Sequence, residues 1–138
     1  MAHGARIDSA VMFVLDLDRS VSFYTEVLGL EVTDQSPTAA LLTSATGSHL
    51  IIRAMGAGAV HALGGVGVQY IIWAAAGEED LARAEQTLKD RSAHVDTRKS
   101  GAVTAVEGRD PDDIVVMVTY PGSDQEPLQK LPSRIYGW

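Results

Sequence analysis

Side chains able to bind a metal ion or to act as nucleophiles are scarce in this sequence of 138 residues. It contains no cysteine, which excludes a disulfide framework, a thiolate zinc site, an iron–sulfur cluster and a cysteine nucleophile. The four histidines are far apart in the sequence: His3, His49, His61 and His94. We expect solvent exposure for His3, near the N-terminus, and for His61, in a glycine-rich stretch, and we expect His94 to cap the end of a helix. Few side chains that could bind a metal ion therefore remain.

Acid–base chemistry would depend on a few scattered side chains. Tyr70, His49 or Glu107 could act as an acid or a base, and Arg53 could hold an anion. No Ser-His-Asp order, paired-carboxylate motif or glycine-rich phosphate loop accompanies them in the sequence. Ordinary roles compete for the same residues: Tyr70 in the core, His49 at a solvated strand end, Arg53 in a surface ion pair. We expect the carboxylate of Glu107 to face water.

The charge balance limits the partners of the protein. Lys and Arg number 11 against 18 Asp and Glu, a formal net charge of −7, which argues against nucleic-acid binding and against a polybasic membrane anchor. The most apolar stretch, residues 66–76, is interrupted by Gln69 and is too short to span a bilayer. Residues 1–9 lack the apolar core of a signal peptide, so we expect a cytoplasmic protein that binds neither nucleic acid nor membrane.

The first half of the chain predicts a strand, a helix and three more strands. Residues 7–15 are apolar and rich in β-branched side chains, which is typical of a buried strand. Asp16, or alternatively Asp18, is placed to cap a helix that Gly29 would end. The apolar stripe of that helix is formed by Val21, Tyr24 and Leu28. The further strands are expected at residues 30–33, 39–43 and 49–53.

The same order of elements is expected again in the second half. After a glycine-rich linker, residues 54–66, a buried strand at 68–75 precedes a helix that begins with three acidic residues, Glu78 to Asp80. Strands follow at residues 94–97, 103–107 and 114–119. The repetition predicts an α+β fold of two βαβββ modules. The predicted single domain, residues 1–138, divides into module one (7–53), the linker (54–66), module two (67–119) and a C-terminal tail (120–138).

Two segments carry a resemblance to a known family. Residues 16–30, with the sequence DLDRSVSFYTEVLGL, resemble the signature of the vicinal-oxygen-chelate superfamily, and residues 109–112 (RDPD) resemble its companion motif. The superfamily includes glyoxalase I, extradiol dioxygenases, fosfomycin-resistance transferases and bleomycin-resistance binding proteins. The resemblance covers residues 7–119 and implies that the sheets curl into a mixed-sheet cup. It also implies a homodimer, with the modules paired within one chain or between subunits.

The resemblance further implies four positions for metal ligands, one on the first and one on the last strand of each module. Those positions are occupied by Ser9, Ile51, Tyr70 and Met117, and the aliphatic and thioether side chains among them offer no hard ligand. If the strand alignment slips by two residues, His49 or Arg53 takes the place of Ile51. Arg53 cannot bind a metal ion, and His49 alone would make a poor site. We therefore expect neither a metal ion nor another cofactor.

If the ligand positions point inward, strand alternation sends a mainly apolar set of side chains into the cup. The ligand-binding residues we expect are Ser9, Val11, Phe13, His49, Ile51, Arg53, Tyr70, Ile72 and Met117. The opposite faces of the same strands would pack on the helices: Met12, Val14, Ile71, Trp73, Val116 and Val118. We expect Thr119, although it has the inward parity, to face water.

Three functions remain open at this point. An apolar cup with a few polar groups is typical of a small-molecule pocket, and Tyr and Phe stack on planar ligands. This favours a metal-free protein that sequesters a hydrophobic, aromatic compound, as in drug or antibiotic resistance. The alternative is a glyoxalase-like enzyme, either a metal-free isomerase or cyclase or a metal-dependent lyase or dioxygenase with displaced ligands. An interaction module with no ligand is the third.

Overall fold

The computed structural model describes residues 4–5, 7–55 and 68–121. The chain divides into two compact units, residues 1–62 and 63–138, and each is described by itself. The linker predicted at residues 54–66, beyond Met55, and the predicted tail, beyond Pro121, lie outside the described residues. Within the described ranges, no helix has the length and apolar character needed to cross a membrane.

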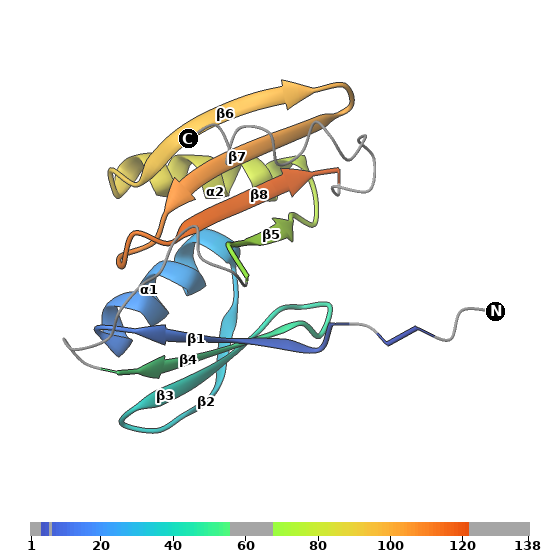
Figure 1. The fold of residues 1–138 in the computed structure, drawn as a ribbon. Coiled ribbons are helices and arrows are strands. Elements are labelled where there is room, and N and C mark those ends of the chain that lie inside the picture. Colours follow the sequence, from blue (N-terminus) through green and yellow to red (C-terminus); the bar gives the residue numbers. More distant parts are fainter. Residues whose placement is uncertain (1–3, 6, 56–67, 122–138) are drawn as a thin grey trace. The chain divides into compact units, whose positions relative to one another are not determined.

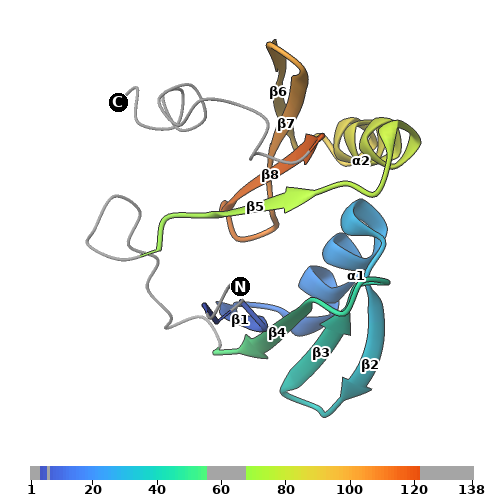
Figure 2. The same cartoon turned by 90° about the vertical axis from the view of Figure 1, so that its right-hand side faces the viewer.

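Unit one contains a four-stranded mixed sheet and one helix (Figures 1 and 2). Along the chain it comprises β1 (Ser9–Val14), α1 (Leu17–Leu28), β2 (Glu31–Gln35), β3 (Ala39–Thr43) and β4 (His49–Ala54). The strand order in the sheet is β1-β4-β3-β2. The chain returns after β3 so that β4 pairs in parallel with β1 and antiparallel with β3.

Helix α1 begins and ends where the sequence predicts. The side chain of Asp16 accepts a hydrogen bond from the backbone N–H of Arg19 at 3.0 Å, and Gly29 ends the helix in the left-handed conformation, with φ of 68°. The helix buries Phe23 and Tyr24, whose rings meet edge to face. It packs on β3 and β4, where the sheet contributes fully buried side chains: Leu42, Leu50 and Ile52.

Unit two repeats this architecture. It comprises β5 (Ile71–Ala74), α2 (Glu78–Asp90), β6 (His94–Ser100), β7 (Val103–Arg109) and β8 (Val115–Tyr120). The strand order is β5-β8-β7-β6, with β5 parallel to β8 (Figure 1). Gly108 of β7 lets α2 approach closely, because a Cβ atom there would lie only 2.7 Å from Leu88 Cδ2. The predicted α+β fold of two βαβββ modules is therefore confirmed.

The element boundaries differ from the predicted ones mainly in unit two. β5 is shorter than the apolar run 68–75, whereas β6 and β7 are longer because they pair with each other along a hairpin. The turn before β8 is held by Asp110, whose Oδ1 accepts hydrogen bonds from the N–H groups of Asp112 and Ile114 at 2.8 and 2.9 Å.

Candidate functional site

The sheet face of unit one that lies opposite α1 carries the predicted module-one residues. Leu50 and Ile52 point to α1 and are fully buried, so alternation turns His49, Ile51 and Arg53 of β4 to the other side. The parallel register places the predicted residues of β1 beside them: Ser9 opposite His49, Val11 opposite Ile51 and Phe13 opposite Arg53. β3 adds the residues directly across from these: Ala39, Leu41 and Thr43. We call this surface the module-one open face.

The module-one open face is apolar, and it is most accessible along its edge strand β1. Val11 is 62% exposed and Phe13 is 58% exposed, although both lie in the middle or at the end of a well-formed strand. Ile51 and Leu41 are half-buried beside them. Exposed apolar side chains gathered on one face, unlike singly scattered ones, are typical of an interaction surface.

A chain of polar contacts crosses one corner of the same face. His49 Nδ1 lies 3.1 Å from Thr43 Oγ1, which lies 2.8 Å from Thr33 Oγ1. The hydroxyl of Thr33 also donates to the carbonyl oxygen of Leu41 at 3.3 Å. Thr33 reaches both partners because the β2–β3 register shifts between Val32 and Asp34, which leaves Thr33 outside the regular ladder. The side chain of His49 is therefore fixed by its neighbours.

The corresponding face of unit two is buried on β7 and β8, whereas Ile72 on the edge strand β5 is 36% exposed. Gly108 lies against Leu88 of α2 and pairs with Val116, so the alternate residue Met117 and its neighbours Ile72 and Glu107 point away from the helix. Met117 is only 3% exposed. Tyr70 lies directly before β5 and is half-buried. The predicted module-two residues Ile72 and Met117 are thus adjacent in the sheet.

Two residues expected to face water are instead buried. Glu107 is 7% exposed and Thr119 is 1% exposed. The expectation was wrong because neither residue ends its strand: β7 continues to Arg109, and β8 continues to Tyr120. Both strands also have a neighbour on each side, and the hydroxyl of Thr119 donates to the carbonyl oxygen of Trp73 at 3.5 Å.

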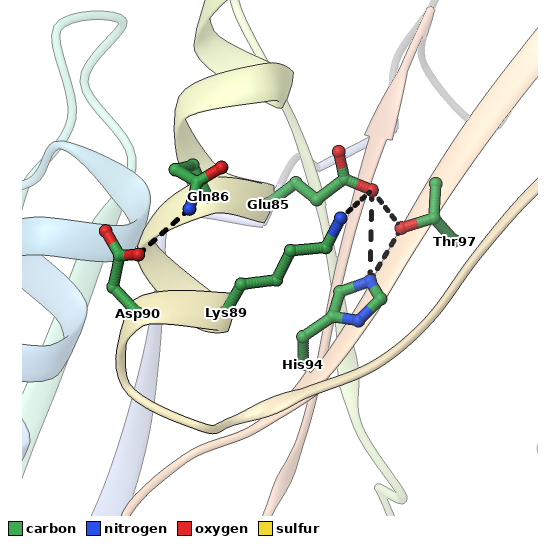
Figure 3. A network of polar contacts seen from close by, with 6 residues as sticks. All are labelled: Glu85, Gln86, Lys89, Asp90, His94 and Thr97. Carbon is green, nitrogen blue, oxygen red and sulfur yellow. Dashed lines mark hydrogen bonds and ion pairs between the residues drawn. The ribbon is translucent and has the colours of Figure 1, made fainter.

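His94 does not cap α2 as expected. Arg91 occupies the cap position, and His94 is the first residue of β6. Figure 3 shows the contacts of the His94 side chain. Its Nε2 lies 2.7 Å from Thr97 Oγ1 and 3.9 Å from Glu85 Oε2, and the Thr97 hydroxyl donates to the same carboxylate oxygen. Lys89 Nζ lies 3.8 Å from that oxygen. This cluster joins α2 to β6 on the helix side of the sheet, away from Met117 and Glu107.

The side chains at the four implied ligand positions do not fit a divalent cation. In unit one, Ser9 pairs with His49, and Ile51 lies two residues further along β4. In unit two, Met117 pairs with Ile72, and Tyr70 lies two residues before Ile72. The offset is the same in both units, so the two pairs of positions correspond. They supply two hydroxyl groups, a hydrocarbon and a thioether, and no imidazole or carboxylate. Within the described part of the chain, nowhere do three or more His, Asp or Glu side chains gather as they would around a metal ion.

Comparison with known families agrees with the architecture. The Glyoxalase/Bleomycin resistance protein/Dioxygenase superfamily matches residues 6–118, which is most of the chain. The chain belongs to this superfamily. No curated protein is similar enough to count as a match.

Solved structures with the superfamily fold resemble this member at low sequence identity. A glyoxylase/bleomycin resistance protein/dioxygenase domain from Frankia sp. EAN1pec is 20% identical, with a TM-score of 0.72 over 83% of this chain and 96% of that one. A putative glyoxalase from Bacillus halodurans is 17% identical, with a TM-score of 0.66 over 82% and 93%. Lactoylglutathione lyase from Agrobacterium tumefaciens is 18% identical, with a TM-score of 0.64 over 84% and 93%. At these identities the likeness establishes the fold of this superfamily member and nothing finer.

Proposed function

We propose that this superfamily member binds a hydrophobic, aromatic small molecule on the module-one open face and sequesters it unchanged, as a resistance protein does. The exposure of Val11 and Phe13 beside Ile51 carries the proposal. Covering these side chains with a planar ligand removes apolar surface from water, and the ring of Phe13 can stack on an aromatic one. A few polar groups around an apolar centre then orient the ligand, and His49, Ser9 and Arg53 occupy that border.

The proposed binding requires no metal ion. Ser9 and Ile51, at the two ligand positions implied for this face, offer one hydroxyl and one hydrocarbon. Affinity would come instead from apolar contact and one or two hydrogen bonds.

We also propose that the protein is a homodimer, which size-exclusion chromatography with light scattering would test.

Calorimetric titration with planar aromatic compounds, beginning with 1-naphthol, tests the binding proposal. Phe13→Ser and Val11→Ser remove apolar surface from the module-one open face, and each should weaken binding about tenfold or more. Val32→Ser is the matched control, because Val32 is 41% exposed but pairs with Leu42 and so lies on the other face of the sheet. The control should bind as the wild type does. Equal loss in all three variants, or no binding by the wild type, would contradict the proposal.

A metal-free enzyme is the second candidate, and Glu107 is the observation that favours it. Glu107 is more than nine-tenths buried on the sheet face that points away from α2, a setting in which acids and bases of enzymes are found. Chromatography of each bound compound after incubation would separate the two functions. Conversion that Glu107→Gln abolishes would establish the enzyme, whereas full recovery of the compound supports sequestration.

A further inference from the structure

The donor and the acceptor can be assigned for each hydrogen bond in the chain of polar contacts on the module-one open face. Each threonine hydroxyl has one hydrogen to donate, and a backbone carbonyl oxygen can only accept. The hydroxyl of Thr33 donates its hydrogen to Leu41 O, so in its contact with Thr43 it must accept. Thr43 therefore donates its own single hydrogen to Thr33 Oγ1.

The same reasoning extends to the imidazole. Because Thr43 has used its hydrogen, its oxygen can only accept from His49, at the 3.1 Å contact between Thr43 Oγ1 and His49 Nδ1. All three contacts are hydrogen bonds at once only if His49 Nδ1 carries a proton. The carbonyl of Leu41 therefore determines, through two hydroxyl groups, which nitrogen of the ring is protonated.

We propose that the neutral imidazole of His49 adopts the Nδ1–H tautomer and then presents Nε2 as a hydrogen-bond acceptor to the ligand. The ligand class rests on the proposed function and narrows it. We infer that the ligand is an aromatic molecule with a hydroxyl or N–H group attached to its ring. His49 is half-buried at the edge of the exposed apolar residues, directly opposite Ser9 and two residues from Ile51. A ring lying over Val11 and Ile51 would place such a substituent within reach of this corner.

The tautomer can be measured without any ligand. In protein with ¹⁵N-labelled histidine, in mildly alkaline buffer, two-bond ¹H–¹⁵N correlation spectra distinguish a protonated ring nitrogen from an unprotonated one. We expect a protonated Nδ1 at His49, and we expect Thr43→Val to abolish that preference. Thr25→Val is the control, because the hydroxyl of Thr25 donates to Ser22 O on α1 and takes no part in the chain. A protonated Nε2 in the wild type, or no change in Thr43→Val, would overturn the fixed tautomer.

The ligand class is tested with two compounds of similar shape, 1-naphthol and 1-methoxynaphthalene, since only the first can donate a hydrogen bond. The wild type should bind 1-naphthol about 3- to 10-fold more tightly, the effect of one net hydrogen bond. Thr43→Val should reduce this ratio toward one, and Thr25→Val should preserve it. Equal affinity of the wild type for both compounds would overturn the acceptor role of His49 while leaving aromatic binding in place. Failure of the wild type to bind either compound would overturn the proposed function and its ligand class. The tautomer measurement would still decide whether the chain of polar contacts fixes the protonated nitrogen of His49.

Discussion

Gly108 of β7 lies directly beneath Leu88 of α2, and there is no room between them for a methyl group. A Cβ atom at position 108 would lie 2.7 Å from Leu88 Cδ2 and 2.9 Å from the backbone oxygen of Ala93. Leu88 could shift by a rotamer change, but the backbone oxygen could not move without disturbing the turn between α2 and β6. Glycine is therefore the only residue that allows the helix to pack at this distance.

We expect Gly108→Ala to lower the free energy of unfolding by about 1–3 kcal/mol, the usual cost of overpacking a core. Denaturant unfolding followed by circular dichroism would measure it. Gly4→Ala is the control, since a Cβ atom there meets nothing within 4 Å. A Gly108→Ala variant as stable as the wild type would mean that α2 is not held so close to the sheet.

The two helices start differently, and the difference predicts opposite effects of substitution. Asp16 caps α1 through its side chain, whereas Gly77 begins α2 with no side-chain cap. Asp16→Ala should cost about 1 kcal/mol of stability, and Gly77→Ser should add a few tenths. Thermal unfolding of both variants would check the signs, and a stabilised Asp16→Ala variant would show that its bond to Arg19 N does not matter.

The polar cluster between α2 and β6 predicts a loss of stability when its shared hydroxyl is removed. Thr97 donates to Glu85 and, with that hydrogen committed, accepts from His94 Nε2 (Figure 3). Thr97→Val breaks both contacts and should lower stability by about 1–2 kcal/mol. Thr104→Val on the adjacent strand β7 is the comparison, and it should change stability by less than Thr97→Val does. Similar losses in both variants would assign the effect to the strands and not to the cluster.

The donor set on the module-one open face predicts its response to metal ions. We expect the wild type not to retain Zn²⁺ through gel filtration, and Ser9→His combined with Ile51→Glu to retain more, because the pair supplies an imidazole and a carboxylate on the face that holds His49. Elemental analysis of the protein fraction is the measurement. Val32→Glu adds a carboxylate on the other face of the sheet and should not gain zinc. Stoichiometric zinc in the wild type would contradict the metal-free proposal.

Much of the fold could be predicted from local sequence patterns. Asp16 and Gly29 mark the ends of α1, and the repeated order of apolar segments predicts two modules, because capping, glycine conformation and hydrophobic periodicity act over a few residues. The same alternation correctly separates the two faces of β4, placing Leu50 and Ile52 toward the helix. Which residues share a face is thus a short-range property of the chain.

Burial and hydrogen-bond direction could not be predicted in this way. The pairing of Glu107 with Met117 places Glu107 and Thr119 on one face of the sheet, and their burial depends on strand lengths and on neighbours far away in the sequence. The hydrogen bonds that orient the ring of His49 could not be predicted either, because no residue pattern in β2 indicates the register shift at Thr33. Only a register between strands brings Thr33, Thr43 and His49 into one line.

The parallel pairs described above also constrain the order of folding during synthesis. Every strand that pairs in the first sheet, from Ser9 to Ala54, has been translated before the first strand of the second sheet begins at Ile71. Among the described residues, no backbone pair of the first sheet waits for a later segment, and the longest closure joins β1 to β4, with α1, β2 and β3 between them. Closure entropy grows only slowly with loop length, so this closure costs little more than that of a hairpin. We therefore expect the N-terminal sheet to form on the ribosome while the rest of the chain is still being made.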